Sequence, residues 1–273
     1  MTRYGFIGTG SMGSMLVRQF IQTGLVTPGE ITASSKTGAS AGALADETGI
    51  IAVPANRRVA EEADLLFICV KPLEVRGVLQ EIRSELDRDS LLVSIAACVS
   101  LADLEAWGGD KARCVRIIPS VTAEENAGIS LVAWGRRVLP EDKTRVLGLL
   151  HAIGTAVELE EKDLEVCTNL TSCGPALIAA MMKELGSAAV RTGAIQPELA
   201  EYLLRETMDG TARILADKGM TFDTVIERVA TPGGSTEEGV RLIASRLPGV
   251  MDEVHEVLFA KRRLVTDQVE RNG

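Results

Sequence analysis

The sequence predicts an α/β fold, with a doubly wound and largely parallel sheet in the N-terminal half and an all-α domain after it. Short apolar runs alternate with helical patterns as far as residue 159, which is typical of βαβ units. Beyond that point only helical periodicity appears. The 46% hydrophobic content of the 273 residues is sufficient for a packed core. We therefore expect two domains, residues 1–159 and 160–273.

The first elements of the α/β half are short. Residues 3–8 form an apolar run that predicts a strand, and residues 11–23 place Met12, Leu16 and Phe20 on one side of a helix. The elements that follow are a strand at 30–34, a helix at 39–47, a strand at 50–53 and a helix at 57–62.

Continuous apolar runs predict the central strands. The run within 64–70 (DLLFICV) is typical of a parallel strand that is buried on both faces. Pro72 then begins a helix that is expected to reach residue 86. The same alternation predicts strands at 90–96, 113–118, 128–134 and 155–159, and helices at 101–107 and 141–152.

The second half is helical throughout. Its expected helices cover 161–192 with a break at 173–175, then 197–218, 223–229, 235–246 and 250–269. A turn at Thr231–Gly234 precedes the fourth of them, and Pro248-Gly249 is expected to end it. This domain is small and rich in amphipathic faces, so we expect a homodimer or a higher homo-oligomer of dimers.

Composition excludes several functions. The net charge of −9 and the 3% aromatic content argue against nucleic-acid binding. The two histidines lie in predicted helices and favour packing roles, and the five cysteines show no metal spacing, so no metal site is expected. The sequence shows no leader pattern and no apolar run of about 18 residues, so we expect no membrane association and a cytoplasmic protein.

A glycine-rich motif joins the first predicted strand to the first helix, and its pattern G-x-G-x-x-G is typical of dinucleotide sites. In such a loop the first glycine makes the turn, the second admits the pyrophosphate and the third lets helix and strand pack closely. The helix N-terminus then binds the anion. The alternative is a glycine-rich connection without a ligand. The residues concerned are Gly8, Thr9, Gly10, Ser11, Met12 and Gly13.

The end of the second strand bears on the choice of cofactor. An NAD site places Asp or Glu there, whereas this chain has Ser34, Ser35 and Lys36. Hydroxyls and an ammonium group suit a 2′-phosphate, so the sequence favours NADP(H), with NAD(H) as the second choice. The alternative is that Lys36 is only a solvated loop charge.

Two further strand ends lie at the same edge of the predicted sheet, where ligands of open α/β folds bind. The second of them carries small residues that admit a nicotinamide to the backbone. Lys71 has the alternative role of capping its own strand end. The residues are Val70, Lys71 and Pro72 after one strand, and Ser94, Ala96 and Ala97 at the end of the next.

These motifs, with Cys173-Gly174-Pro175-Ala176 and Pro232-Gly233-Gly234-Ser235-Thr236, occur in the order seen in pyrroline-5-carboxylate reductases, and the chain resembles that family over essentially its whole length. The resemblance implies NADPH-dependent reduction of 1-pyrroline-5-carboxylate to L-proline. It also implies that 1–159 is an NADP-binding Rossmann domain and 160–273 a substrate-binding and dimerisation domain. The active site would lie between them and be completed by a partner subunit.

The same resemblance assigns roles to single residues. It implies that the turn binds the substrate carboxylate through Thr231, Gly233, Gly234 and Ser235, and that the hydroxyl of Thr236 faces the ring nitrogen. It also places Asn56 near the cofactor ribose. Because these glycines open a helix, their N–H groups suit an anion, although the same hydroxyls also suit simple helix capping.

Two positions depart from the usual family pattern. Ser120 replaces the usual Asn, and Cys173 stands in a usual Gly-Ser-Gly-Pro. Both features resemble the divergent late-competence branch of the family. Two alternatives therefore stay open, namely a non-catalytic NADP-binding regulatory relative and a reductase of another imine or a 3-hydroxy acid. The 3-hydroxy acid alternative requires a Lys and an Asn on one long helix, and here Lys183 has no Asn a turn after it.

Overall fold

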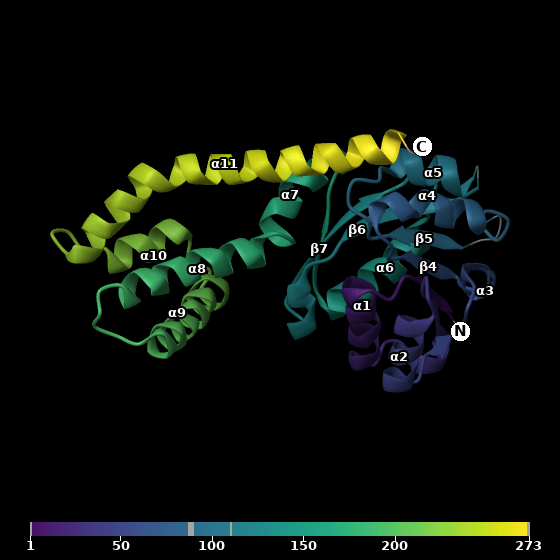
Figure 1. Ribbon diagram of the computed structural model, residues 1–273, viewed down its shortest axis with the longest axis horizontal. Helices are drawn as coiled ribbons and strands as arrows, with labels where there is room; N and C mark the ends of the chain where they lie inside the picture. The colour runs from purple at the N-terminus through teal and green to yellow at the C-terminus, as the bar shows by residue number, and fades with distance from the viewer. Residues whose placement is uncertain (1, 87–89, 110, 272–273) are drawn as a thin grey trace. The chain divides into compact units, whose positions relative to one another are not determined.

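The computed structural model describes residues 2–86, 90–109 and 111–271 (Figure 1). The chain divides into two compact units, Met1–Pro175 together with Phe259–Gly273, and Ala176–Leu258. The domain boundary between residues 159 and 160 remains a prediction.

The first unit is built on one eight-stranded sheet, in the order β3-β2-β1-β4-β5-β6-β7-β8. Every neighbouring pair is parallel except β6 and β7. The order reverses at β1, as in a doubly wound fold, so the fold-class prediction is confirmed. The strands are β1 Tyr4–Ile7, β2 Ile31–Ser34, β3 Ile51–Ala52, β4 Leu65–Ile68, β5 Leu91–Ser94, β6 Arg113–Ile118, β7 Gly128–Trp134 and β8 Gly154–Glu158.

Helices cover both faces of this sheet. One apolar core lies under α1 (Ser11–Gln22), α2 (Ala39–Thr48) and α6 (Pro140–Ala152). The other lies under α3, α4 and α5 and includes residues of α7 and of the end of α11 (Ser235–Arg271). Figure 1 shows α4 and α5 on one side of the sheet and α1 and α6 on the other. The remaining bounds are α3 Asn56–Glu62, α4 Pro72–Glu81, α5 Leu101–Gly108 and α7 Leu164–Thr171, with 3-10 turns at Pro28–Glu30, Val121–Glu125 and Glu161–Asp163.

Three phenylalanines fix α1 against the two strands that it crosses. The rings of Phe6 on β1 and Phe67 on β4 are stacked with centroids 4.6 Å apart. Phe20 of α1 lies 5.7 Å from Phe67 and 6.4 Å from Phe6, both at a tilt. All three are buried, and such contacts add to the stability that area burial gives. The cluster thereby holds α1 against β1 and β4 through the last part of the helix.

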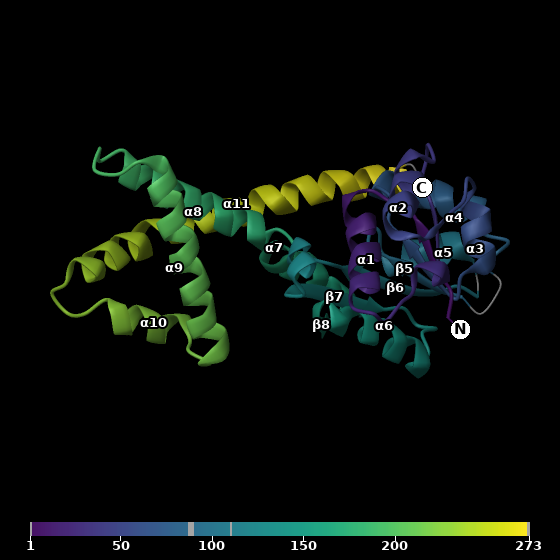
Figure 2. The ribbon, with the colours of Figure 1, turned by 90° about the horizontal axis from the view of Figure 1, so that it is seen from below.

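The second unit contains helices alone, α8 (Gly174–Val190) from its third residue on, α9 (Pro197–Asp217), α10 (Phe222–Val229) and the first part of α11 (Ser235–Arg271) (Figure 2). The helix expected over 161–192 is interrupted, as predicted, but the gap lies at 172–173 rather than 173–175, because α7 ends at Thr171 and Gly174 and Pro175 open α8. In the part of the chain that the structure describes, no helix is long and apolar enough to cross a membrane.

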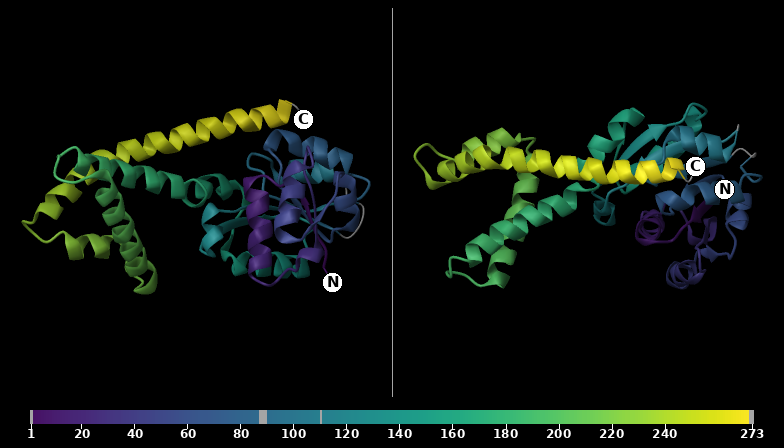
Figure 3. Two further views of the ribbon diagram at one scale, coloured as in Figure 1. Left: turned by 60° about the horizontal axis from the view of Figure 1, so that its bottom comes forward. Right: turned by 45° about the horizontal axis from the view of Figure 1, so that its top comes forward.

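Two predicted boundaries are wrong. Pro248 does not end a helix, since α11 runs for 37 residues with this proline inside it (Figure 3). Proline removes one backbone hydrogen bond, but the helix continues on either side of it. The helix that begins at Pro72 ends at Glu81, and residues 82–86 form turns instead.

Candidate functional site

The loop between β1 and α1 has a backbone that only glycine suits at its first position. Gly8 has φ +100°, and its N–H donates to the Ser34 carbonyl at 2.9 Å. A Cβ on Gly8 would lie 2.7 Å from the carbonyl oxygen of Cys69. The first glycine of the motif therefore makes the tight turn between three strand ends, as its role predicts.

The other two glycines differ sharply in their surroundings. A Cβ on Gly13 would collide with the carbonyl oxygen of Gly8, so Gly13 is required by the fold itself. A Cβ on Gly10 would meet nothing within 4 Å. Gly10 is the N-cap of α1, where no described side chain caps the helix, and the first turn carries no acidic residue. The loop therefore fits a dinucleotide, because open N–H groups and open space coincide at Gly10.

The side chains of this loop divide between packing and solvent. Thr9 is buried, and its hydroxyl and that of Ser40 share a hydrogen bond of 2.8 Å. The carbonyl of Thr9 accepts from the Ser14 hydroxyl at 2.9 Å. Met12 packs against the core under α1, whereas Ser11 is exposed. Thr9 and Met12 thus anchor the loop by hydrogen bonding and packing, whereas the Ser11 side chain is exposed to solvent.

A chain of polar contacts begins at the end of β2. The Ser34 hydroxyl is fully buried and donates to Asn56 Oδ1 at 2.8 Å. Asn56 Nδ2 in turn donates to Glu81 Oε2 at 2.8 Å. Ser34 and Asn56, predicted separately as cofactor-binding residues, are therefore brought into direct contact.

Lys36 is not a solitary loop charge. Its Nζ lies 3.0 Å from Glu74 Oε1, and both side chains are substantially exposed. Its neighbour Ser35 accepts a hydrogen bond from the N–H of Ala41 at 3.2 Å, which ties the loop to α2. The ammonium group is thus at the expected strand end, but it faces a carboxylate.

The ends of β4 and β5 lie beside the glycine loop, because β1, β4 and β5 are successive strands of the sheet. Lys71 is exposed and is the N-cap residue of α4, where its carbonyl accepts from the Glu74 N–H at 2.9 Å. Val70 and Pro72 are half-buried around it. Burial raises the pKa of the neighbouring Cys69 thiol, which keeps that group neutral.

The end of β5 is made of small residues. Ser94 and Ala96 are buried, and the Ser94 hydroxyl accepts from the Ala96 N–H at 3.3 Å. Ala97 is half-buried, and Cys98 after it has φ +64°, a conformation that costs a residue other than glycine on the order of 1 kcal/mol. The strand therefore ends in a turn of small residues, with Ile95 packed against the core.

The predicted substrate turn lies in the second unit and is bonded within itself. The Gly234 N–H donates to the Thr231 carbonyl at 2.9 Å, and Gly233 has φ +77°. Ser235 and Thr236 are exposed at the start of α11. The N–H of Gly233 donates to Glu237 Oε2 at 2.7 Å. A carboxylate of the chain itself thus sits on an N–H group that the prediction assigns to a substrate carboxylate.

The two positions that depart from the family pattern both take part in contacts within the first unit. Ser120 is 1% exposed, donates to the Thr171 carbonyl at 3.0 Å and accepts from the Thr122 hydroxyl at 3.0 Å. Cys173 Sγ lies 3.5 Å from Arg262 Nη2. Ser120 therefore links the segment after β6 to the end of α7.

Sequence reasoning missed Glu74, Glu81 and Glu237, the carboxylates that contact the predicted site residues. A signal existed for the first of them. Lys36 follows β2 and Glu74 lies in the helix after β4, and those two strands flank β1, so the strand order places opposite charges at the same edge of the sheet. Glu237 lies four residues after the Gly233 N–H that it accepts from, which is a local pattern of helix starts.

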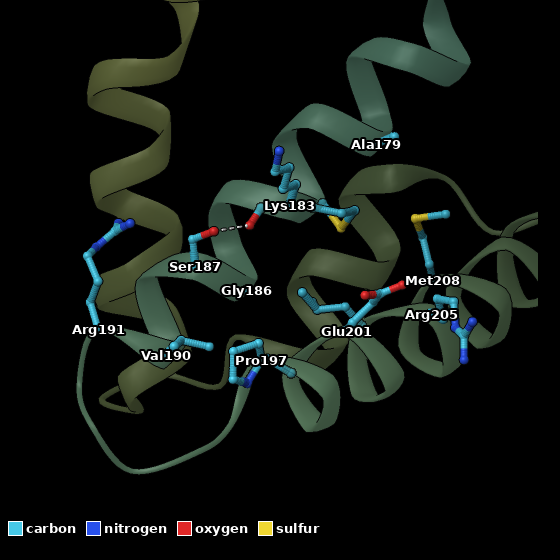
Figure 4. A pocket seen from close by; sticks show the side chains of 13 residues that line it. Ala179, Lys183, Gly186, Ser187, Val190, Arg191, Pro197, Glu201, Arg205 and Met208 are labelled. Carbon is cyan, nitrogen blue, oxygen red and sulfur yellow. Dashed lines mark hydrogen bonds between the residues drawn. The ribbon is translucent and has the colours of Figure 1, made fainter.

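The second unit also contains an apolar pocket of about 710 Å³ between α8 and α9. Figure 4 shows Lys183 and Ser187 on one helix and Glu201 and Arg205 on the other. The Ser187 hydroxyl bonds back to the Lys183 carbonyl at 2.9 Å. The rest of the lining is mainly aliphatic, namely Ala179, Met182, Gly186, Val190, Pro197, Ala200, Leu204 and Met208, with Arg191 among them.

Known proteins resemble this chain over nearly its whole length. Residues 3–98 match the family described as NADP oxidoreductase coenzyme F420-dependent, and residues 161–263 match Pyrroline-5-carboxylate reductase dimerisation. Pyrroline-5-carboxylate reductase 3 of Bacillus subtilis is 37% identical over 270 residues, which cover 98% of each chain. ComE operon protein 4 of the same species is 30% identical over 256 residues, 93% of this chain and 92% of that protein. A crystal structure of Plasmodium falciparum pyrroline carboxylate reductase with NADP bound superposes with a TM-score of 0.85 at 22% identity and covers 98% of both chains.

The sheet order and the glycine loop define a Rossmann-type protein of the dinucleotide-binding class. Within that class, the 37% identity with a pyrroline-5-carboxylate reductase over 98% of each chain identifies the family. The chain belongs to the pyrroline-5-carboxylate reductase family, and the resemblance seen in its motifs is confirmed.

Proposed function

We propose that this protein reduces 1-pyrroline-5-carboxylate to L-proline with NADPH. The observation that carries the proposal is the 37% identity with a pyrroline-5-carboxylate reductase over 98% of each chain. The geometry at Gly10 supports it, because a dinucleotide needs open backbone N–H groups at the start of α1.

The reaction makes modest demands on side chains. The bound nicotinamide supplies the hydride, and the protein has to hold both reactants in register. We assign the pyrophosphate to the N–H groups after Gly10 and the ribose to Asn56, which the buried Ser34 hydroxyl holds in place at 2.8 Å. The turn binds the substrate carboxylate through the N–H groups of Gly233 and Ser235, since that of Gly234 already donates to the Thr231 carbonyl. The Thr236 hydroxyl faces the ring nitrogen. A cyclic imine takes its proton readily from water, so no strong general acid is required of the protein.

A direct assay tests the proposal. The purified full chain is mixed with NADPH and 1-pyrroline-5-carboxylate, and NADPH oxidation is followed by absorbance while proline is quantified. Stoichiometric proline formation supports the reductase. NADPH binding without turnover on this imine, on other cyclic imines or on 3-keto acids would contradict it.

A second candidate is a non-catalytic NADP-binding regulatory protein. It is favoured by the 30% identity with ComE operon protein 4, whose name states no reductase activity, and by Ser120, whose hydroxyl is engaged in local contacts. The same assay separates the two candidates, since this one binds the dinucleotide and turns nothing over.

We also propose a homodimer in which the helical unit completes its core. Among the described residues of α8, α9 and α10, the buried ones are Gly174 and Ala200 alone. Large apolar side chains are exposed instead, with Phe222 at 76% and Leu242 at 59%. Exposed apolar side chains gathered in one unit mark a surface for association.

The five free cysteines suit the reducing cytoplasm, where we place the protein.

Lys36→Asp is expected to raise the dissociation constant of NADPH at least about tenfold while changing that of NADH much less, because an ammonium-to-phosphate hydrogen bond is replaced by charge repulsion. Calorimetric titration of both nucleotides measures the effect. Lys143→Asp, which changes net charge equally on α6, serves as the control. Equal changes for NADPH and NADH would remove the 2′-phosphate assignment.

Glu237→Gln is expected to lower the KM for 1-pyrroline-5-carboxylate by about two- to fivefold with little change in kcat. The Glu237 carboxylate accepts from the Gly233 N–H at 2.7 Å, so the substrate has to displace a negative charge. The matched control is Glu238→Gln, whose carboxylate bonds to Arg241 at 2.8 Å. Steady-state kinetics at saturating NADPH measure the KM for 1-pyrroline-5-carboxylate and kcat in both variants. An unchanged or raised KM would show that Glu237 does not oppose the substrate.

A further inference from the structure

The loop after β2 and the first turn of α4 are joined by an ion pair at the edge of the predicted cofactor site. Lys36 Nζ lies 3.0 Å from Glu74 Oε1. Lys36 follows the end of β2 by two residues, and Glu74 is the third residue of α4, which follows β4. The strands β2 and β4 lie on either side of β1, the strand that leads into the glycine loop.

The Glu74 side chain is ionised at neutral pH. The hydrogen bond from Lys36 and the positive charge of Lys36 lower the pKa of this carboxyl, and Lys71 lowers it further. Its side chain is 42% exposed, so it is open to solvent and to a ligand.

The chemistry of this carboxylate bears on cofactor choice. Sites for NAD carry an acidic residue after the second strand, which accepts from the ribose 2′-hydroxyl and repels a 2′-phosphate. No acid stands at Ser34, Ser35 or Lys36. Glu74 brings a carboxylate to the same place from a different element, through its contact with Lys36.

We propose that Glu74 is a specificity-determining residue that weakens the preference for NADPH over NADH. It does so by holding Lys36, the ammonium group assigned to the 2′-phosphate, so that the phosphate has to compete with a carboxylate for it. The inference rests on the proposed use of a nicotinamide dinucleotide. Because the ion pair is exposed, its effect is about two- to fivefold in the ratio of affinities.

The test measures binding rather than turnover. NADP⁺ and NAD⁺ are titrated calorimetrically into the full chain and into Glu74→Gln. The expected result is a two- to fivefold rise, roughly, in the ratio of the NAD⁺ to the NADP⁺ dissociation constant. The matched control is Glu47→Gln, which removes the same charge and one exposed ion pair, that with Arg18 at 2.7 Å. An unchanged ratio in Glu74→Gln, or an equal rise in Glu47→Gln, overturns the inference.

A double-mutant cycle tests whether Glu74 acts through Lys36. In a Lys36→Gln background the further change Glu74→Gln is expected to leave the ratio unchanged, because the group for which phosphate and carboxylate compete is gone. A gain of the same size in that background overturns the stated route. Failure of the wild-type chain to bind either nucleotide would overturn the proposed function as well, whereas binding with no shift in the ratio overturns only this inference.

Discussion

Gly10→Ala is expected to raise the dissociation constant of NADPH by at least about tenfold while leaving the free energy of unfolding nearly unchanged. A Cβ at this position meets nothing within 4 Å, and the backbone φ of −74° suits alanine. The methyl group would instead stand where we place the pyrophosphate, against the N–H groups at the start of α1. Titration calorimetry measures the binding, and urea unfolding measures the stability.

Gly13→Ala is the matched variant in the same loop, and it is expected to lower the free energy of unfolding, which Gly10→Ala leaves nearly unchanged. Its Cβ collides with the Gly8 carbonyl, which is backbone and cannot move alone, so the fold should lose about 1–3 kcal/mol. Comparison of the two variants distinguishes Gly10, which is required for NADPH binding, from Gly13, which is required for the stability of the fold. If Gly10→Ala binds NADPH normally, the dinucleotide does not approach this loop.

Thr236→Ala is expected to reduce kcat for imine reduction by about 100-fold while NADPH binding stays nearly constant. The hydroxyl is assigned to the ring nitrogen, and its removal leaves the developing amine without its partner. Thr236 is exposed at the start of α11, so its truncation should cost little stability. Stopped-flow and steady-state rates measure the loss of activity.

The conservative variant Thr236→Ser retains a hydroxyl and is expected to restore most of the rate, which a purely structural role for the methyl group would not allow. If NADPH binding collapses in Thr236→Ala instead, the hydroxyl is misassigned.

The sheet and its glycine loop could be predicted from the sequence because local signals there agree with the fold. The apolar run at 64–70 becomes β4, and Gly8, Gly10 and Gly13 each have the surroundings that their spacing implies. Such motifs act within a few residues, so a single sequence contains them.

The features that the sequence did not reveal depend on contacts between distant residues or on tertiary context. Pro248 is a helix breaker by intrinsic preference, yet α11 continues through it. The contact of Lys36 with Glu74 spans 38 residues. The sequence predicts Ser34 and Asn56 as separate cofactor-binding residues, but their mutual hydrogen bond follows only from the way β2 and α3 pack. Pairing of this kind is a property of the three-dimensional arrangement, which periodicity does not encode.

The near absence of buried residues in α8, α9 and α10 has a consequence for how the protein's stability has to be expressed. If a second copy supplies their missing core, then folding of this unit and association are one equilibrium. Its midpoint temperature then rises with the concentration of the chain, and dilution alone weakens the helical unit while the self-contained sheet of the first unit is spared. A single free energy of unfolding, quoted without a protein concentration, would not describe such a molecule.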